Sequence, residues 1–337
     1  VAARAVAAAV VVWITASAGA RNPMVALLLV GATVQGALAV GQQLHRGPLG
    51  LALLGEAPPD QLFKYIAPEV GLWRSGGTLG HPNALASYAA ALLPVAVAIA
   101  LSRRPLGSRA LGCAAALGSG VALLCTFSRS AWAFSVVAVG GIAVLSGRLR
   151  ALPTRRGLLA AGLCGVFVLA VFPLVRHRLE RTESSATDVR VALALVARDM
   201  IKAYPVSGVG LGQFPNRIAE FDPELKLRLF RHPAHNILLL DGAEAGVPGM
   251  VASVLMWGGG LVTAWCCAWA AARRRDIESA GLWIGSSALI LHNLVDWTLR
   301  QPAILSLFWV LVALASARPT SPHDPIADSE QLAGLHI

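Results

Sequence analysis

The sequence predicts an all-α protein that crosses a membrane several times. Its composition, its apolar segments and the placement of its arginines support this fold class. Of the 337 residues, 56% are hydrophobic and 14% are charged, whereas soluble domains average about 45–50% and about 25%. The mean hydropathy is +0.63. These values exclude a soluble enzyme, a disordered chain and a disulfide-stabilised scaffold.

Each expected span is an apolar run close to the length that a bilayer requires. A hydrocarbon core about 30 Å thick needs about 20 helical residues to cross it. We therefore expect nine transmembrane helices, at 1–19, 23–41, 82–101, 109–127, 130–146, 157–175, 248–272, 279–296 and 302–317.

Arginines mark every second connection between these spans. Cytoplasmic loops carry an excess of basic residues, so we expect these connections inside the cell. They contain Arg21, Arg103, Arg104, Arg109, Arg148, Arg150, Arg155, Arg156, Arg273, Arg274, Arg275 and Arg318. The net charge of +10 matches that of these connections, so it indicates orientation and predicts no nucleic-acid partner. Residue 1 then lies outside, and we expect further spans upstream of it.

The lengths of the connections divide the chain into four regions. Residues 1–175 hold the N-terminal transmembrane helices, and 176–247 form a large outward loop that contains helices. Residues 248–317 hold the C-terminal transmembrane helices. Residues 318–337 are rich in Pro, Ser and Asp, which predicts a disordered cytoplasmic tail.

Arg129 lies beside Ser128 at the outer boundary between two apolar spans. An arginine inside a span costs about 2.5–3.5 kcal/mol on insertion scales, and such residues usually face a wet cavity. We therefore expect a functional role for Arg129. The alternative is an interfacial arginine whose guanidinium snorkels to the headgroups.

A second outer cluster is the stretch Arg-Ser-Gly-Gly-Thr-Leu-Gly-His-Pro-Asn, which runs from Arg74 to Asn83. Its three glycines bring the backbone close to a partner. His81 and Asn83 lie at the start of a helix, where unpaired amides and the macrodipole favour an anion. Both residues also suit a plain helix cap.

Further candidates lie in and after the large loop. Arg190 begins a helix-like stretch, and His235 with Asn236 precedes an apolar helix that contains Glu244. A histidine at the outer end of a span suits general base catalysis. Asp296 closes a later span, where a structural polar cluster between helices is the alternative. His232 and His235 have a metal-ligand spacing, but Pro233 separates them and no third ligand is near, so we expect no metal.

These residues share the outer side under a topology that other residues set. Several arginines with few carboxylates describe an anion site, because guanidinium groups match phosphate geometry. No carboxylate cluster is present to hold Mg²⁺, and we expect no cofactor. An outward site at membrane level favours a lipid-linked diphosphate as the energised substrate. The outer set is Arg74, His81, Arg129, Arg190, His235 and Asp296.

Several motifs in this chain resemble the O-antigen ligase and polymerase superfamily of bacterial membrane glycosyltransferases. The resemblance covers about 70–317. It rests on Gly-Thr-Leu-Gly-His-Pro-Asn (77–83), Ser-Arg-Ser-Ala-Trp (128–132), Arg190 with Tyr-Pro-Val-Ser-Gly-Val-Gly-Leu-Gly-Gln-Phe (204–214), Ala-His-Asn (234–236), Glu-Ala-Gly-Val-Pro-Gly (244–249) and His-Asn-Leu-Val-Asp-Trp (292–297).

The resemblance implies a GT-C-like enzyme of lipopolysaccharide biosynthesis in the bacterial cytoplasmic membrane, with its active site facing the periplasm. It implies inverting, metal-independent transfer of a glycan from an undecaprenyl-diphosphate carrier to an acceptor hydroxyl on a lipid or a glycan. Arg129 and Arg190 would bind the diphosphate, to which we add Arg74, and His235 would be the base. We expect His81, Asn83, Ser128, Asn236, Glu244 and Asp296 to support them.

Two alternatives remain at the level of sequence. A polysaccharide polymerase of the same superfamily differs from a ligase only in its acceptor, and the motifs do not separate the two. A transporter of lipid-linked glycans would also place arginines in a cavity. Transporters, however, tend to show internal repeats and broken helices in both halves, and the sequence shows neither.

Overall fold

The computed structural model describes residues 21–57, 73–145, 185–222 and 232–317. Regular structure in these ranges is helical, and no β-strand occurs in them. The main helices are α2 (Arg21–His45), α3 (Pro82–Leu101), α4 (Leu106–Thr126), α5 (Arg129–Leu145), α7 (Ser185–Ala203), α9 (Ile237–Arg273), α10 (Ile277–Asn293) and α11 (Pro302–Ser316). Short elements are η1 (Ala52–Leu54), η4 (Gly77–Leu79), α8 (Phe214–Arg217), η6 (Ile218–Glu220) and η7 (Thr298–Arg300).

The all-α prediction is confirmed for these ranges, and each predicted span within them coincides with a helix. Four helices are long and apolar enough to cross a membrane, namely α2, α3, α4 and α9. The apolar helices α5 and α11 are shorter, and α10 has 17 residues with Glu278 in its first turn. The predicted spans 1–19 and 157–175 and the predicted tail lie outside the described residues. The count of nine spans stays a prediction.

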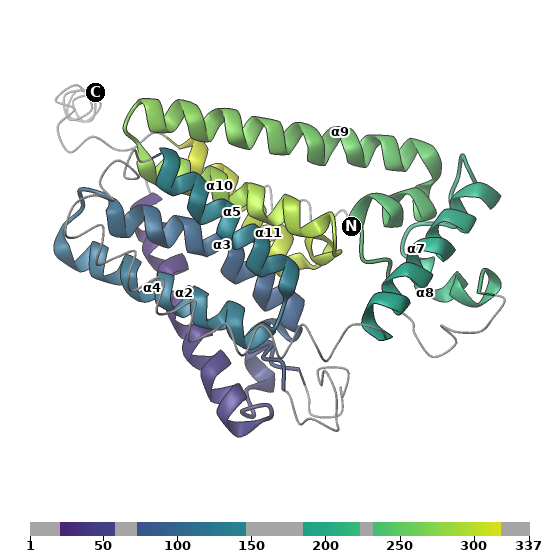
Figure 1. Cartoon of the computed structure of the whole chain (residues 1–337), viewed down its shortest axis with the longest axis horizontal. Coiled ribbons are helices and arrows are strands. Elements are labelled where there is room, and N and C mark those ends of the chain that lie inside the picture. Colours follow the sequence, from purple (N-terminus) through teal and green to yellow (C-terminus); the bar gives the residue numbers. More distant parts are fainter. Residues whose placement is uncertain (1–20, 58–72, 146–184, 223–231, 318–337) are drawn as a thin grey trace, which may run out of the picture.

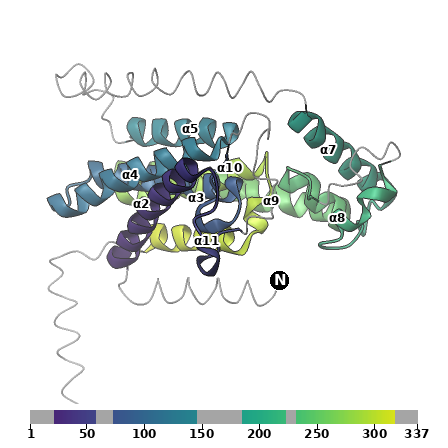
Figure 2. The same ribbon diagram turned by 90° about the horizontal axis from the view of Figure 1, so that it is seen from below.

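Helix α3 lies in the middle of the bundle. It packs against α4 and α10, and Figure 2 shows α5 and α11 on opposite sides of it. Small residues allow close approach: a Cβ on Gly285 of α10 would lie 2.4 Å from the carbonyl oxygen of Ala91 in α3. Close helix packing through small residues is common in membrane proteins. It brings the start of α3 beside the end of α10.

Helix α9 is long and changes direction near its start. Gly246 has φ 71° and ψ −171°, a conformation that side-chain-bearing residues rarely adopt. The turn after α7 packs into this kink, since Val247 N–H donates to Pro205 O at 2.7 Å. Figure 1 shows α7 and α8 at the end of the molecule where α9 begins.

The described part of the predicted large loop has an apolar core of its own. This core joins α7, the glycine-rich turn, α8 and the first part of α9. Phe214, Leu193 and Met200 are fully buried in it. Backbone hydrogen bonds from Val209 and Gly210 to α9 fix the turn against the helix. The loop is therefore attached to the first turns of α9, which follow His235.

Candidate active site

The loop before α3 is held by glutamines from α2. Gln42 Oε1 accepts hydrogen bonds from the backbone amides of Gly76 and Gly77, at 3.1 and 2.9 Å. Gln35 Oε1 accepts from Thr78 N–H. A Cβ on Gly77 would lie 2.2 Å from Gln35 Oε1. The close partner of Gly77 is thus helix α2, whereas a Cβ on Gly80 would lie 3.1 Å from Gly55 O.

Arg74 lies at the base of this loop and connects three segments. Its Nε donates to Thr126 O at the end of α4, and its Nη2 donates to Asn83 Oδ1, both at 2.8 Å. His81 is the N-cap of α3, and its Nδ1 accepts from Asn83 N–H at 3.1 Å. These contacts show that His81 caps α3, and they fix the orientation of the Asn83 amide. The supporting role of His81 in the site stays a prediction.

Asn83 joins the start of α3 to the connection that follows α10. Its Nδ2 donates to Asp296 Oδ2 at 2.6 Å across 213 positions of sequence. Asp296 Oδ1 accepts from Trp297 N–H at 2.8 Å and lies 3.5 Å from His235 Nδ1. A continuous polar chain therefore runs from Arg74 through Asn83 and Asp296 to His235, and it brings together four predicted site residues.

The segment that carries His235 is clamped from both sides. Asn236 caps α9 by accepting from Leu239 N–H at 2.9 Å, and its Nδ2 donates to Leu294 O at 2.8 Å. The His235 side chain is 20% exposed, whereas that of Asp296 is 1% exposed. His235 Nδ1 is buried beside the carboxylate. The remaining exposure leaves the imidazole reachable by a substrate.

The charges of this cluster are set by burial and by the neighbouring groups. Burial lowers the pKa of His81 to about 4, while Asp296 acts in the opposite direction. Burial alone would raise the pKa of Asp296, but His235, His292 and the Trp297 amide outweigh it, so this pKa lies below its usual range. At neutral pH the site contains a neutral His81 and an ionised Asp296.

Glu244 lies in a second polar cluster at the kink of α9. Its Oε1 accepts from Phe214 N–H at 3.3 Å, and its Oε2 pairs with Arg300. Arg300 also pairs with Asp241, whose Oδ2 accepts from Ser253 Oγ at 2.6 Å. Glu244 therefore anchors the large loop and the α10–α11 connection to α9, away from the imidazole of His235.

Arg300 is a residue of this site that was not predicted from the sequence. The signal for it was present, because Arg300 is a basic residue in a short connection that the arginine pattern places outside. Together with Asn236 and His235, it forms three links between the segment 294–301 and the start of α9. These links hold Asp296 against His235.

Arg129 and Arg190, which are also predicted to bind diphosphate, differ from Arg74 in their contacts. Arg129 is the first residue of α5 and is partly buried, and Arg190 lies exposed on α7. Within the described ranges neither makes a hydrogen bond or ion pair. Ser128 is buried, and its N–H donates to Thr126 Oγ1 at 3.4 Å. Because Arg74 also contacts Thr126, the start of α5 lies at the same end of the bundle as the polar chain.

The described residues offer no group of three or more histidine, cysteine, aspartate or glutamate side chains that could hold a metal ion. Asp241 and Glu244, the two neighbouring carboxylates, are both occupied by Arg300.

Residues 113–254 match the family model described as O-antigen ligase. The predicted resemblance is confirmed. The comparison with curated proteins found no match. The O-antigen ligase match and the apolar helices support a multi-pass membrane protein of the ligase- or polymerase-like glycosyltransferase kind, for which lipid-linked glycans are the implied substrates.

The O-antigen ligase segment contains only part of the polar chain. Arg129, Arg190 and His235 lie inside the matched residues. Asn83 and Asp296 lie outside them, and yet the packing of α3 and α10 brings both to His235. The candidate site is thus built from the matched segment and from the helices on either side of it.

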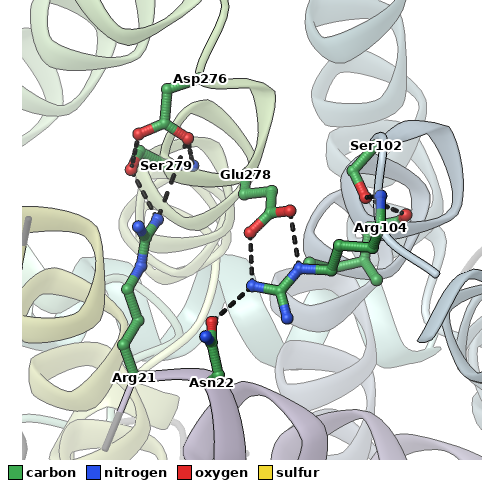
Figure 3. Close-up of polar contacts among 8 residues, drawn as sticks. Arg21, Asn22, Ser102, Arg104, Asp276, Glu278 and Ser279 are labelled. Carbon is green, nitrogen blue, oxygen red and sulfur yellow. Dashed lines mark hydrogen bonds and ion pairs between the residues drawn. The ribbon is translucent and has the colours of Figure 1, made fainter. Parts of the chain in front are cut away.

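The opposite end of the bundle contains a different kind of polar cluster (Figure 3). Arg104 pairs with Glu278 at 2.7 Å, and Arg21 donates to Ser279 Oγ at 2.7 Å beside Asp276. These contacts tie the start of α2 and the α3–α4 connection to the start of α10. Arginines that the sequence predicts as markers of orientation therefore also join helices.

Proposed function

We propose that this protein transfers a glycan from an undecaprenyl-diphosphate carrier to an acceptor hydroxyl at the outer face of the bacterial cytoplasmic membrane. The observation that carries this proposal is the pairing of a partly exposed His235 with a buried Asp296. Arg129 at the start of α5 and Arg190 on α7 are without partners among the described residues. A base and two available cations are what such a transfer requires.

His235 is the proposed base. Asp296 faces Nδ1, so the neutral ring carries its proton there and presents Nε2 to the acceptor. The acceptor hydroxyl gives its proton to Nε2 as its oxygen attacks the anomeric carbon. The carboxylate of Asp296 then stabilises the imidazolium that forms. Their 3.5 Å separation is typical of catalytic contacts that tighten only when substrate is bound.

Arg129 and Arg190 are the proposed ligands of the leaving group. The bond between the anomeric carbon and the diphosphate breaks as the acceptor bond forms on the opposite face, so the configuration inverts. The departing diphosphate gains negative charge, which guanidinium groups in a site of low dielectric stabilise strongly. Arg74 stays a predicted diphosphate ligand, although its contacts with Asn83 and Thr126 favour a positioning role.

A polymerase is the second candidate, because the match to the O-antigen ligase family supports ligase-like and polymerase-like enzymes alike. The two share the donor, the base and the leaving group. They differ in whether the acceptor hydroxyl belongs to a lipid core or to a growing glycan.

The test is transfer by the purified protein from a defined undecaprenyl-diphosphate glycan. We expect product with this donor and none with the matching monophosphate, and we expect the rate to persist in EDTA. A lipid-core acceptor and a glycan acceptor, supplied separately, distinguish ligase from polymerase. Absence of product with both acceptors, or complete loss of product in EDTA, would contradict the proposal.

A further inference from the structure

His292 is a fully buried histidine that the mechanism above leaves without a role. It lies in the last turn of α10 and is 0% exposed. Its Nδ1 lies 2.5 Å from Ser87 Oγ, which is itself 2.7 Å from Thr298 Oγ1. One ring nitrogen is thus engaged by a hydroxyl chain between α3 and η7.

The hydroxyl chain determines which nitrogen carries the proton. Asn293 Nδ2 donates to Thr298 Oγ1 at 3.3 Å, so the Thr298 hydroxyl gives its own proton to Ser87 Oγ. The Ser87 hydroxyl then gives its proton to His292 Nδ1. In this arrangement the Asn293, Thr298 and Ser87 donors each have an acceptor. His292 is therefore neutral with its proton on Nε2.

That Nε2–H has no partner. Nε2 is buried without a hydrogen bond among the described residues. The ring of Phe134 in α5 meets the imidazole edge-on at 6.4 Å between centroids, too far for its face to accept the proton. Buried donors in native proteins are nearly always satisfied, so an unpaired one indicates a missing acceptor.

The surroundings of Nε2 indicate the chemistry of that acceptor. Arg190 lies close enough for its charge to act on His292, as does Asp296 on the neighbouring turn. Asp296 is occupied by Asn83 and Trp297. Arg190, in contrast, makes no hydrogen bond or ion pair with any described residue. A buried N–H donor within range of the charge of an unpaired guanidinium matches an anionic oxygen.

We propose that His292 is a further binding residue for the lipid-linked diphosphate, with its Nε2–H donating to a phosphoryl oxygen beside Arg190. This inference rests on the proposed function for the class of ligand. Because Nε2 is shielded from solvent, a neighbouring side chain must move when the diphosphate enters.

Two matched substitutions test this role. His292→Asn places its amide near the position of Nδ1 and keeps a contact with Ser87, but it has no donor at the position of Nε2. His292→Gln reaches that position with an amide N–H. The probe is farnesyl diphosphate, added to the purified full-length protein in detergent, and binding is read from the rise in melting temperature across a concentration series.

We expect wild type and His292→Gln to bind the diphosphate within about threefold of each other, and His292→Asn to bind at least about tenfold more weakly. Wild-type affinity in His292→Asn would overturn the role of His292 and leave the proposed function standing. No stabilisation of wild type by the diphosphate would overturn the donor class and this inference together.

The melting temperature without ligand controls for folding. If His292→Asn does not fold, the double substitution Ser87→Ala with His292→Leu removes the hydroxyl and the imidazole together, so neither is left facing the vacated position of the other. The same tenfold loss is expected, and binding equal to wild type would again overturn the role. Arg198→Gln, on the exposed face of α7, should bind as wild type does.

Discussion

The polar cluster shown in Figure 3 and the candidate active site use arginine in different ways. In the cluster of Figure 3, Arg104 meets the carboxylate of Glu278, and Arg21 lies against Asp276 and Ser279. In the candidate active site, Arg74 binds the neutral amide of Asn83, while Arg129 and Arg190 have no partner among the described residues.

The difference separates charges that hold helices together from charges that are available to a ligand. An arginine paired with a carboxylate is already neutralised, whereas an unpaired arginine at a membrane surface attracts an anion. The charge of Asp296 is likewise not neutralised by an arginine. Its partners are an amide side chain, a backbone amide and a histidine. The predictions below challenge this comparison, from the largest expected effect to the smallest.

Removing the unpaired charges should have the largest effect on the donor. Arg129→Gln and Arg190→Gln should each raise the KM for the lipid-diphosphate glycan by roughly 10-fold to 100-fold, since hydrogen bonds to charged groups contribute about 1.5–3 kcal/mol. Steady-state kinetics with varied donor measures this. Arg198→Gln, on the same helix but paired with Asp199, is the matched control and should leave this KM unchanged. An equal rise in KM in the test and control variants would contradict the comparison.

Neutralising Asp296 should act on the chemical step instead. Asp296→Asn retains an oxygen to accept from Asn83, but its amide offers no charge to an imidazolium at His235. We expect kcat to fall by roughly tenfold to a hundredfold, the range that a misplaced or unsupported catalytic group produces. The KM for donor should change less than threefold. A rise in KM without a fall in kcat would place Asp296 with the diphosphate ligands.

Substitutions in the polar cluster of Figure 3 should lower the stability of the protein and leave catalysis unchanged. Arg104→Gln and Glu278→Gln each break a partly buried pair, and we expect a loss of about 1–3 kcal/mol with unchanged KM for donor. A double-mutant cycle on melting in detergent isolates the pair. Loss of donor binding in Arg104→Gln would show that this cluster also serves the substrate.

The smallest effect concerns His81 and pH. Its pKa is about 4 in the folded protein and 6.5 when unfolded, so the unfolded chain binds the proton first as pH falls. Stability should therefore drop by about 1 kcal/mol between pH 7 and pH 5.5. His81→Asn retains a helix cap and should remove that part of the slope. An unchanged slope between these pH values in the variant would contradict the assignment.

The sequence predicted the helices more fully than the contacts between them. Apolar runs set the positions of α3, α4 and α9 because bilayer thickness fixes their length. The contact between Asn83 and Asp296 spans 213 positions, and no local pattern encodes it. Only the close packing of α3 on α10, through glycines such as Gly285, brings the two residues together.

The glycine-rich motif before α3 shows where local reasoning stopped. The sequence indicated that the backbone there approaches a partner closely. Residue type alone did not show that Gln35 and Gln42 of α2 are that partner. Likewise, Arg300 carried a signal as an outer arginine, and yet its link to Glu244 spans 56 positions and no local pattern encodes it.

The most direct test of the account is the rate of glycan transfer by His235→Ala at saturating donor and acceptor. General acid–base catalysis contributes about 10²–10⁴-fold, so we expect the rate to fall by that factor while binding of the diphosphate donor is retained. His45→Ala, at the exposed end of α2, is the matched control and should transfer at the wild-type rate. A His235→Ala rate within about threefold of wild type would contradict the role of His235 as the base.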